Sequence, residues 1–167
     1  VVIDHFPGGR GFANVEKGLG LDARGRLILH DGEGAEYLLQ PDGAVTSLDG
    51  EATSYRVDED GNVTRDGESA GNIYLKEGVD PHESLLTART SYLVEVHSDD
   101  DGETWSKPRH INHMVKEGWM GFLGTSPGNG IQLSAGKHRG RLLIPYYCTG
   151  TSPTVSYTHL RAHETLR

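Results

Sequence analysis

Five Asp-Gly pairs separate short segments of mixed apolar and polar residues in the first half of the chain. The pairs stand at positions 31–32, 42–43, 49–50, 60–61 and 66–67. Aspartate and glycine tolerate the positive φ of type I′ turns best, so Asp-Gly between alternating segments is a strong local signal for a β-hairpin. The spacing predicts an antiparallel meander of short strands.

The remainder of the chain also predicts β-structure. Further strands are expected at 90–98, 131–134 and 141–148, where apolar and β-branched residues recur. Residues 112–117 are expected to form one or two helical turns, which Gly118 would end. The tail at 155–167 is predicted to be strand-free and resembles a translated sequencing adapter, so we interpret it as non-native.

Composition limits the partners of the chain. Its 167 residues include 16 Lys+Arg against 24 Asp+Glu, a net charge of −8, whereas nucleic acids and anionic membranes require a clustered basic face. No window approaches the about 18 apolar residues of a membrane span. We expect no nucleic-acid partner and no membrane insertion. The chain starts without methionine or a signal-peptide pattern, and we expect it to be cut at both ends.

The single cysteine, Cys148, limits the cross-links and metal sites that the chain can form. A disulfide needs two thiols, and a cysteine zinc site needs two to four. We therefore expect a buried, free thiol.

The most specific motif is an Asp box, S-x-D-x-G-x-T-W. Its residues are Ser98, Asp100, Gly102, Thr104 and Trp105. The serine and aspartate oxygens are expected to accept backbone N–H groups of a tight hairpin, the glycine to take positive φ, and the tryptophan to pack beneath the turn. A calcium loop is the alternative. The EF-hand pattern, however, requires a glutamate at its twelfth position, which falls near Arg109 in this chain, and no glutamate stands there. We predict a structural turn and no metal.

Aromatic residues in two glycine-rich segments are candidates for a binding cleft. Phe6 and Phe12 bracket the first segment, and Trp119, Met120 and Phe122 lie in the second. Two readings are open, because such residues pack in a core or line the apolar wall of a ligand site. Carboxylates are also frequent on the predicted hairpins, where they are usually solvated. No convincing acid/base pair is present, so we assign no catalytic residue.

Residues 90–147 resemble the first complete Asp-box segment of bacterial exo-α-sialidases of the retaining glycoside hydrolase family. The motifs that carry this resemblance are TSYLVEV before the Asp box, WMGFLG at 119–124, SPGNGI at 126–131 and GRLLIP at 140–145. Upstream, DHFPGGRGF at 4–12 and the hairpins that end in GNIY at 71–74 are similar to the β-rich insertion that those enzymes carry in their propeller.

The resemblance implies an all-β fold, namely one to two blades of a six-bladed β-propeller with an inserted antiparallel hairpin-rich module. It further implies a cofactor-free enzyme that hydrolyses terminal α-linked sialic acid with retention. The family uses a tyrosine nucleophile polarised by glutamate, an aspartate acid/base and three arginines that hold the sugar carboxylate. None of these groups is identifiable in this chain, so the fragment alone is predicted to be inactive.

The resemblance also predicts the domain organisation and the site. Residues 1–12 would be a loop bordering the cleft, 13–88 the inserted module, 89–154 the blade segment and 155–167 the non-native tail. Substrate-binding residues would be Phe6, Phe12 and Phe122.

We expect a fragment of a secreted or cell-surface bacterial sialidase that acts on sialylated glycans. The alternatives are a non-catalytic carbohydrate-binding or adhesion module, and another Asp-box propeller protein.

Overall fold

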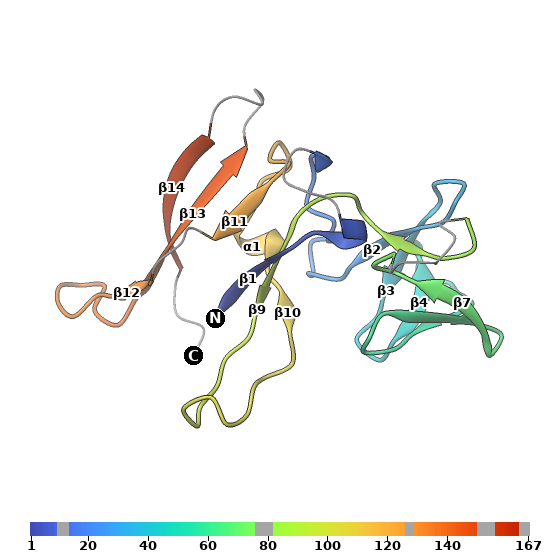
Figure 1. The fold of residues 1–167 in the computed structure, drawn as a ribbon, viewed down its shortest axis with the longest axis horizontal. Helices are drawn as coiled ribbons and strands as arrows, with labels where there is room; N and C mark the ends of the chain where they lie inside the picture. The colour runs from blue at the N-terminus through green and yellow to red at the C-terminus, as the bar shows by residue number, and fades with distance from the viewer. Residues whose placement is uncertain (10–13, 76–81, 126–128, 150–155, 164–167) are drawn as a thin grey trace.

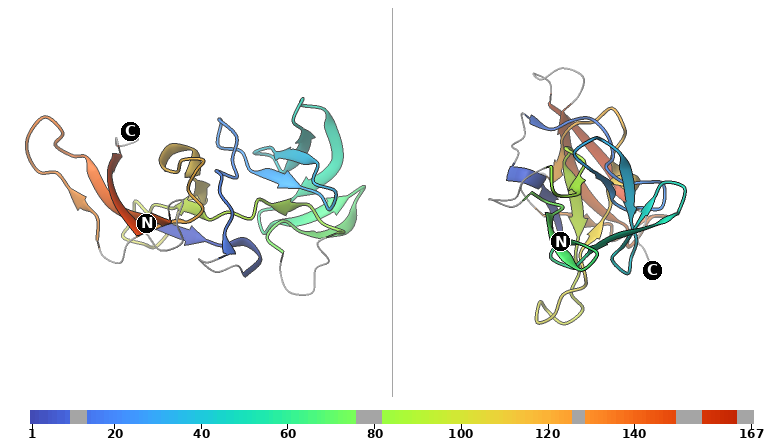
Figure 2. Two further views of the ribbon diagram at one scale, coloured as in Figure 1. Left: turned by 90° about the horizontal axis from the view of Figure 1, so that it is seen from above. Right: turned by 90° about the vertical axis from the view of Figure 1, so that its right-hand side faces the viewer.

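Three antiparallel sheets make up the computed structural model, which describes residues 1–9, 14–75, 82–125, 129–149 and the backbone of 156–163 (Figure 1). Seen from above, the largest sheet lies at one end of the molecule, β13 and β14 lie at the other, and β1 lies between them (Figure 2). The all-β prediction is confirmed. None of the helices in the described ranges is long and apolar enough to cross a membrane.

The largest sheet has seven strands in the order β7-β6-β5-β4-β3-β2-β8. Its strands are β2 (Ile28–His30), β3 (Glu36–Leu39), β4 (Ala44–Ser47), β5 (Ala52–Val57), β6 (Asn62–Arg65), β7 (Glu68–Asn72) and β8 (Leu86–Thr87). The backbone N–H of Thr87 donates to the carbonyl of Ile73 at 2.9 Å, which joins β8 to the residue after β7. The sheet is therefore nearly closed, and we call it the hairpin module.

The predicted hairpins are present, but most of their turns differ from the predicted type. Only Asp66 and Gly67 both have positive φ, as a type I′ turn requires. At the pairs 42–43, 49–50 and 60–61 the glycine alone has positive φ, and at 31–32 neither residue does. The N–H of Gly43 donates to Gln40 O at 3.0 Å, so this turn is one residue longer and the glycine is its last member.

An aspartate three positions before the glycine organises three of the longer turns. Asp22, Asp31 and Asp58 each accept backbone N–H groups two and four residues ahead, at 2.8–2.9 Å. Each carboxylate thus satisfies two donors that the hairpin leaves open. The pattern Asp-x-x-Gly, rather than Asp-Gly, is the sequence signal for these turns.

A single apolar cluster fills the hairpin module. Its buried members are Leu21, Leu27, Leu29, Val45, Val57, Val63, Ile73, Leu85 and Tyr92. Leu29, Val45, Val57 and Val63 come from four different strands of the nearly closed sheet, as expected when one side chain in two along each strand faces inward. The others lie in the segments next to strands of this sheet, except Tyr92, which belongs to a strand outside the module.

The second sheet joins the start of the chain to its middle. It has the order β1-β9-β10, formed by β1 (Val2–His5), β9 (Tyr92–Glu95) and β10 (Arg109–His110). Asp4 on β1 pairs with Leu93 on β9. Residues 1–12 were expected to form a loop, but residues 2–5 form a strand, because β9 offers an open edge that short-range sequence patterns do not reveal.

The third sheet is built on the eight-residue strand β13 (Leu142–Thr149). It also contains β11 (Leu123–Thr125), β12 (Ile131–Gln132) and β14 (Ser156–His163). A second core, comprising Leu93, Ile111, Val115, Met120, Leu123, Tyr146 and Cys148, lies between this sheet and β9. Cys148 is buried and free, as predicted. The short helix α1 (Asn112–Val115) follows β10, and η1 (Pro7–Gly9) follows β1.

The expectation of a strand-free tail is wrong. β14 pairs with β13 along its whole length, from Leu142 opposite His163 to Thr149 opposite Ser156. An eight-residue edge strand presents a row of unpaired backbone groups, and pairing with it outweighs the weak β-propensity of the tail.

Two glycine substitutions in the hairpin module test the turn geometry. Gly43 and Gly50 both have positive φ, but a Cβ at Gly43 would lie 2.4 Å from Val57 O, whereas nothing lies within 4 Å at Gly50. We expect Gly50→Ala to lose about 1 kcal/mol through backbone strain alone. Gly43→Ala should lose at least about 1 kcal/mol more, because the backbone must also move. Urea unfolding of both variants measures the difference, and equal losses would contradict the close approach.

Candidate functional site

Three aromatic rings meet where the second and third sheets lie side by side. The rings of Phe6 and Phe122 are stacked, with centroids 5.5 Å apart and planes 3° from parallel. The ring of Tyr147 packs against Phe122 with a centroid distance of 5.1 Å. We call these three residues the aromatic wall. The structure thus brings together two of the three predicted substrate-binding residues, and Phe12 lies outside the described residues.

Strand pairing places each ring of the wall. Phe6 follows β1, Phe122 precedes β11, and Tyr147 lies on β13 opposite Gly124. The hydroxyl of Thr125 donates to Asp4 Oδ1 at 3.1 Å, which ties β11 to β1. The wall therefore spans three strands that are far apart in the sequence.

The three side chains of the aromatic wall differ in their solvent exposure. Phe122 is 1% exposed, whereas Phe6 and Tyr147 are half-buried. The side chains of the wall that a ligand can reach are therefore Phe6 and Tyr147, and Phe122 packs against both. Of the neighbouring candidates, Trp119 is exposed, and Met120 is part of the second core.

The backbone on both sides of Phe122 is held by hydrogen bonds. The N–H of Phe122 donates to Thr149 Oγ1 at 3.0 Å, and its carbonyl accepts from Thr149 N at 3.1 Å. Ser91 Oγ accepts from Leu123 N at 3.0 Å and donates to Gly121 O at 3.2 Å. Hydrogen bonds thus hold the backbone that carries the ring, and packing holds the ring itself.

A buried polar cluster connects this backbone to α1, and sequence reasoning missed it. Its members, which we call the polar cage, are Thr90, Ser91, Asn112 and Lys116, all at most 5% exposed. Asn112 Oδ1 accepts from Leu93 N at 2.8 Å, while Asn112 Nδ2 donates to Leu19 O and Ser91 O. The residues are distant in sequence and polar, so no local pattern predicts that they are buried together.

The predicted Asp-box residues lie in the hairpin between β9 and β10, which projects from the molecule in Figure 1. Ser98 Oγ accepts from Gly102 N, and Asp100 Oδ1 accepts from Thr104 N, both at 2.8 Å. The hydrogen bond from the Thr104 hydroxyl is the largest of several that lower the pKa of Asp100 to about 2. Gly102 has a φ of 94°, as its predicted role requires.

Trp105 lies against the turn but is not buried there. It remains 53% exposed, although its ring edge lies 3.8 Å from where a Cβ on Gly102 would stand. The turn is therefore held by hydrogen bonds to Ser98 and Asp100 rather than by a buried tryptophan.

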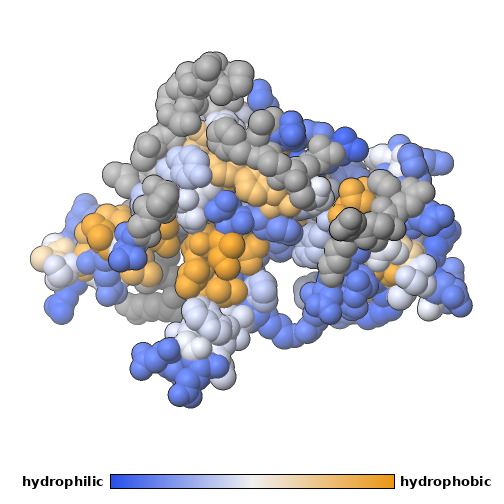
Figure 3. All heavy atoms as spheres, viewed as in Figure 1, coloured by the Kyte–Doolittle hydropathy of each residue, from blue (hydrophilic) through white to orange (hydrophobic). Residues whose placement is uncertain are grey.

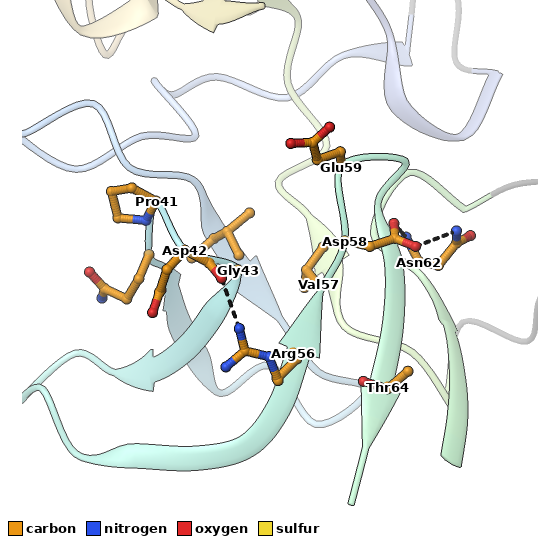
Figure 4. Close-up of a pocket in the computed structure, with 11 residues that line it drawn as sticks. Pro41, Asp42, Gly43, Arg56, Val57, Asp58, Glu59, Asn62 and Thr64 are labelled. Carbon is orange, nitrogen blue, oxygen red and sulfur yellow. Dashed lines mark hydrogen bonds between the residues drawn. The ribbon is translucent and has the colours of Figure 1, made fainter. Parts of the chain in front are cut away.

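Two adjoining cavities open on the hairpin module, away from the aromatic wall. One, of about 560 Å³, lies over the turns at 40–43 and 58–62. Figure 4 shows two hydrogen bonds in its lining: Arg56 donates to Asp42 O at 2.8 Å, and Asn62 donates to Asp58 Oδ2 at 2.9 Å. These contacts build turns. In the part of the chain that the structure describes, no group of three or more His, Cys, Asp or Glu could hold a metal ion.

The other cavity, of about 600 Å³, lies between the module and the segment 107–113. The molecule is hollowed between its central part and the module in Figure 3. Three of the four arginine and lysine side chains in this lining pair with carboxylates: Arg26 with Asp22 at 2.7 Å, Arg109 with Glu95 at 2.6 Å, and Lys107 with Glu59. Such a balanced surface gives no indication of a charged ligand.

Gly124 tests how the aromatic wall is packed. A Cβ at this position would lie 2.2 Å from Cζ of Phe122, whereas at Gly121 the nearest atom is 3.4 Å away. We expect Gly124→Ala to displace the Phe122 ring and to lower the free energy of unfolding by about 1–3 kcal/mol. Gly121→Ala, the matched control, should stay within about 0.5 kcal/mol of the parent. Urea unfolding measures both values, and a silent Gly124→Ala would show that the ring has room to move.

Comparisons with known proteins identify the architecture around this wall. No family model matches the chain. In sequence, it is 37% identical over 76 residues to the anhydrosialidase of the leech Macrobdella decora and 42% identical over 55 residues to the sialidase of Bacteroides fragilis. These matches cover 46% and 33% of the chain but only 9% and 10% of those proteins.

Solved structures match nearly the whole chain. The intramolecular trans-sialidase of Ruminococcus gnavus, in complex with oseltamivir carboxylate, aligns over 94% of the chain with a TM-score of 0.72 and 24% identity. A leech intramolecular trans-sialidase aligns with a TM-score of 0.73 and 23% identity, and the NanB sialidase of Streptococcus pneumoniae with 0.63 and 18%.

The chain spans 40%, 28% and 29% of those three structures, respectively. The second and third sheets therefore correspond to part of a β-propeller, with the hairpin module inserted between β1 and β9. In fold the chain is therefore similar to a segment of a sialidase β-propeller, and in sequence it is similar to short stretches of proteins named sialidase and anhydrosialidase.

Proposed function

We propose that the chain is part of an exo-α-sialidase that removes terminal α-linked sialic acid from glycoconjugates. The observation that carries the proposal is the aromatic wall, in which a reachable Phe6 is stacked on a buried Phe122 at the junction of two propeller sheets. A rigid apolar face of this kind suits the C–H surfaces of a sugar. The sequence identity to proteins named sialidase and anhydrosialidase supports this substrate class.

The roles within the proposed site follow from position. Phe6 and Phe12 would contact the substrate, and Phe122 would hold Phe6 in place. The groups that perform the chemistry in the family would come from other parts of the protein, as the sequence resemblance implies. The Asp box, with Ser98 and Asp100 at its centre, would be a structural turn.

The proposed organisation keeps the ranges expected from the sequence. Residues 13–88 would be the inserted module and 89–154 the blade segment, with 1–12 bordering the cleft and 155–167 a non-native tail. The pairing of β1 with β9 across the module supports the insertion.

Exposed apolar residues support a larger propeller around this segment. Val1 and Ile3 on the β1 side are 65% and 50% exposed, and apolar residues gather near the centre of the face in Figure 3. Leu142 on β13 is also exposed. Blades of a propeller pack face to face, so neighbouring blades would cover these side chains. We further propose a bacterial protein that is secreted or held at the cell surface and needs no cofactor.

The first test concerns the isolated chain. Because the catalytic groups of the family are not identifiable in its 167 residues, we expect no turnover of a fluorogenic α-sialoside by the purified chain. The longer protein that contains the chain should release the fluorophore, whether the sugar leaves by hydrolysis or by intramolecular transfer. Turnover by the isolated chain would show that catalytic groups lie within it.

The second test concerns the aromatic wall in the longer protein. Phe6→Ala and Phe12→Ala should each lower kcat/KM for the sialoside by about tenfold, because each removes a proposed apolar contact with the sugar. For Phe6→Ala the melting temperature should change little, because the ring is only half-buried. Phe122→Ala should instead destabilise the protein by about 3–5 kcal/mol, because it leaves a buried cavity. Steady-state kinetics and thermal unfolding separate the two effects. Unchanged kinetics for Phe6→Ala would remove this residue from the site.

A further inference from the structure

We propose that Lys116 is a positioning residue of the aromatic wall, and that the protonation of its amine inside the polar cage adjusts the backbone that carries Phe122. This inference rests on the proposed function for its kinetic consequence, but its structural part can be tested without catalysis. The inference names a pH-responsive element in the segment and assigns a role to a buried lysine that forms no ion pair within the described part of the chain.

The surroundings of Lys116 are unusual for a lysine. The residue directly follows α1 and is 5% exposed. Its Nζ donates to the hydroxyl of Thr90, to Ser91 O at 3.0 Å and to Ser91 Oγ at 3.4 Å. No carboxylate of the described residues forms an ion pair with it, and burial lowers its pKa to about 7. The amine therefore loses its charge within the physiological pH range rather than far above it.

The same hydroxyls hold the backbone around Phe122. Ser91 Oγ, which accepts from Lys116, also accepts from Leu123 N at 3.0 Å and donates to Gly121 O at 3.2 Å. The Thr90 hydroxyl lies 3.2 Å from Gly121 O and also within reach of the carbonyls of Glu16 and Gly18. One serine and one threonine thus connect Nζ to the residues on both sides of Phe122.

Proton counting shows why the state of Lys116 matters to this backbone. A charged ammonium group has three donors and no acceptor, so it must use Thr90 Oγ1 as an acceptor, and the Thr90 proton then goes to a backbone carbonyl. A neutral amine has two protons and one lone pair, so Thr90 can donate to Nζ instead. Loss of the Lys116 proton therefore allows the hydrogen bond between Nζ and Thr90 Oγ1 to reverse. The Thr90 hydroxyl then no longer donates to the backbone carbonyls around it, which include that of Gly121.

Other ionisable groups near the cage do not account for this behaviour. His113 and Glu117 lie beside Lys116 in sequence, Glu16 and Arg89 flank Thr90, and Tyr92 and Cys148 lie in the adjoining cores. Burial is the only cause of the lowered pKa of Lys116. Since the unfolded chain keeps this proton up to its ordinary pKa of 10.5, the free energy of unfolding should rise as the pH increases from about 7 to about 10.

Nuclear magnetic resonance of the chain tests the structural part. Cζ of Phe122 would lie 2.2 Å from a Cβ on Gly124, so the Gly124 resonances report the ring position. We expect the Gly124 and Leu123 amide signals to move with one inflexion near pH 7, and Lys116→Met to abolish it. Lys137→Met, at an exposed lysine on the turn before β13, is the control and should keep the inflexion.

A second variant guards against misfolding of Lys116→Met. Thr90→Val removes an acceptor that favours the charged amine, so it should shift the inflexion to lower pH while keeping the lysine. An inflexion that is absent in the parent, or that persists in Lys116→Met, overturns the inference.

The kinetic part requires the longer protein. We expect Lys116→Met to raise KM for the fluorogenic sialoside by roughly fivefold and to change kcat by less than about twofold, because the lysine does not touch the reacting atoms. The parent KM should change across pH 7, and the KM of the variant should lose that inflexion. A purely structural lysine would lower the melting temperature and leave the pH profile of KM in place. If the parent shows no turnover, the proposed function fails, and the amide titration still decides the role of Lys116.

Discussion

Two consecutive residues of β9 connect the two cores of this structure. Neighbouring residues on a strand point to opposite faces, and here both faces are fully covered: Tyr92 packs in the hairpin module, and Leu93 packs in the core beside α1. Burial at both positions fixes the register of β9, because a slip by one residue would exchange the two side chains. The pairing of β1, the position of β10 and the contact between module and propeller all depend on that register.

The hairpins were predictable because their signal is local. A turn that requires positive φ is usually marked by a glycine, so most strands of the module could be placed from the sequence, although β7 and β8 could not. The turn type was less predictable, because a glycine can end a longer turn as readily as it completes a two-residue one. Asp58 shows the missing information: its carboxylate holds the turn from three positions before Gly61, outside the Asp-Gly pair at 60–61.

The candidate site was predictable only in part, for a related reason. Phe6 and Phe122 could be named as aromatic residues in glycine-rich segments, but their stacking depends on β1 and β11 lying side by side, which no local pattern encodes. The same holds for β14, whose pairing is supplied by the edge of β13. Sequence reasoning also gave Phe6 and Phe122 the same role, whereas the structure leaves Phe6 half-buried and Phe122 only 1% exposed.

The polar cage shows why a lysine can be retained where an apolar side chain would usually be more stable. Replacing a buried charged group with a well-packed apolar one is often neutral or favourable, provided that no partner is left without a hydrogen bond. Here Lys116 Nζ donates to the hydroxyls of Thr90 and Ser91 and, together with the Asn112 amide, to Ser91 O. Removing Lys116 alone therefore leaves acceptors such as Ser91 O with fewer donors. The cage is therefore stable only as a set. Because its members come from the two residues before β9 and from α1 and the residue after it, the set couples the packing of these two segments to the backbone of Phe122.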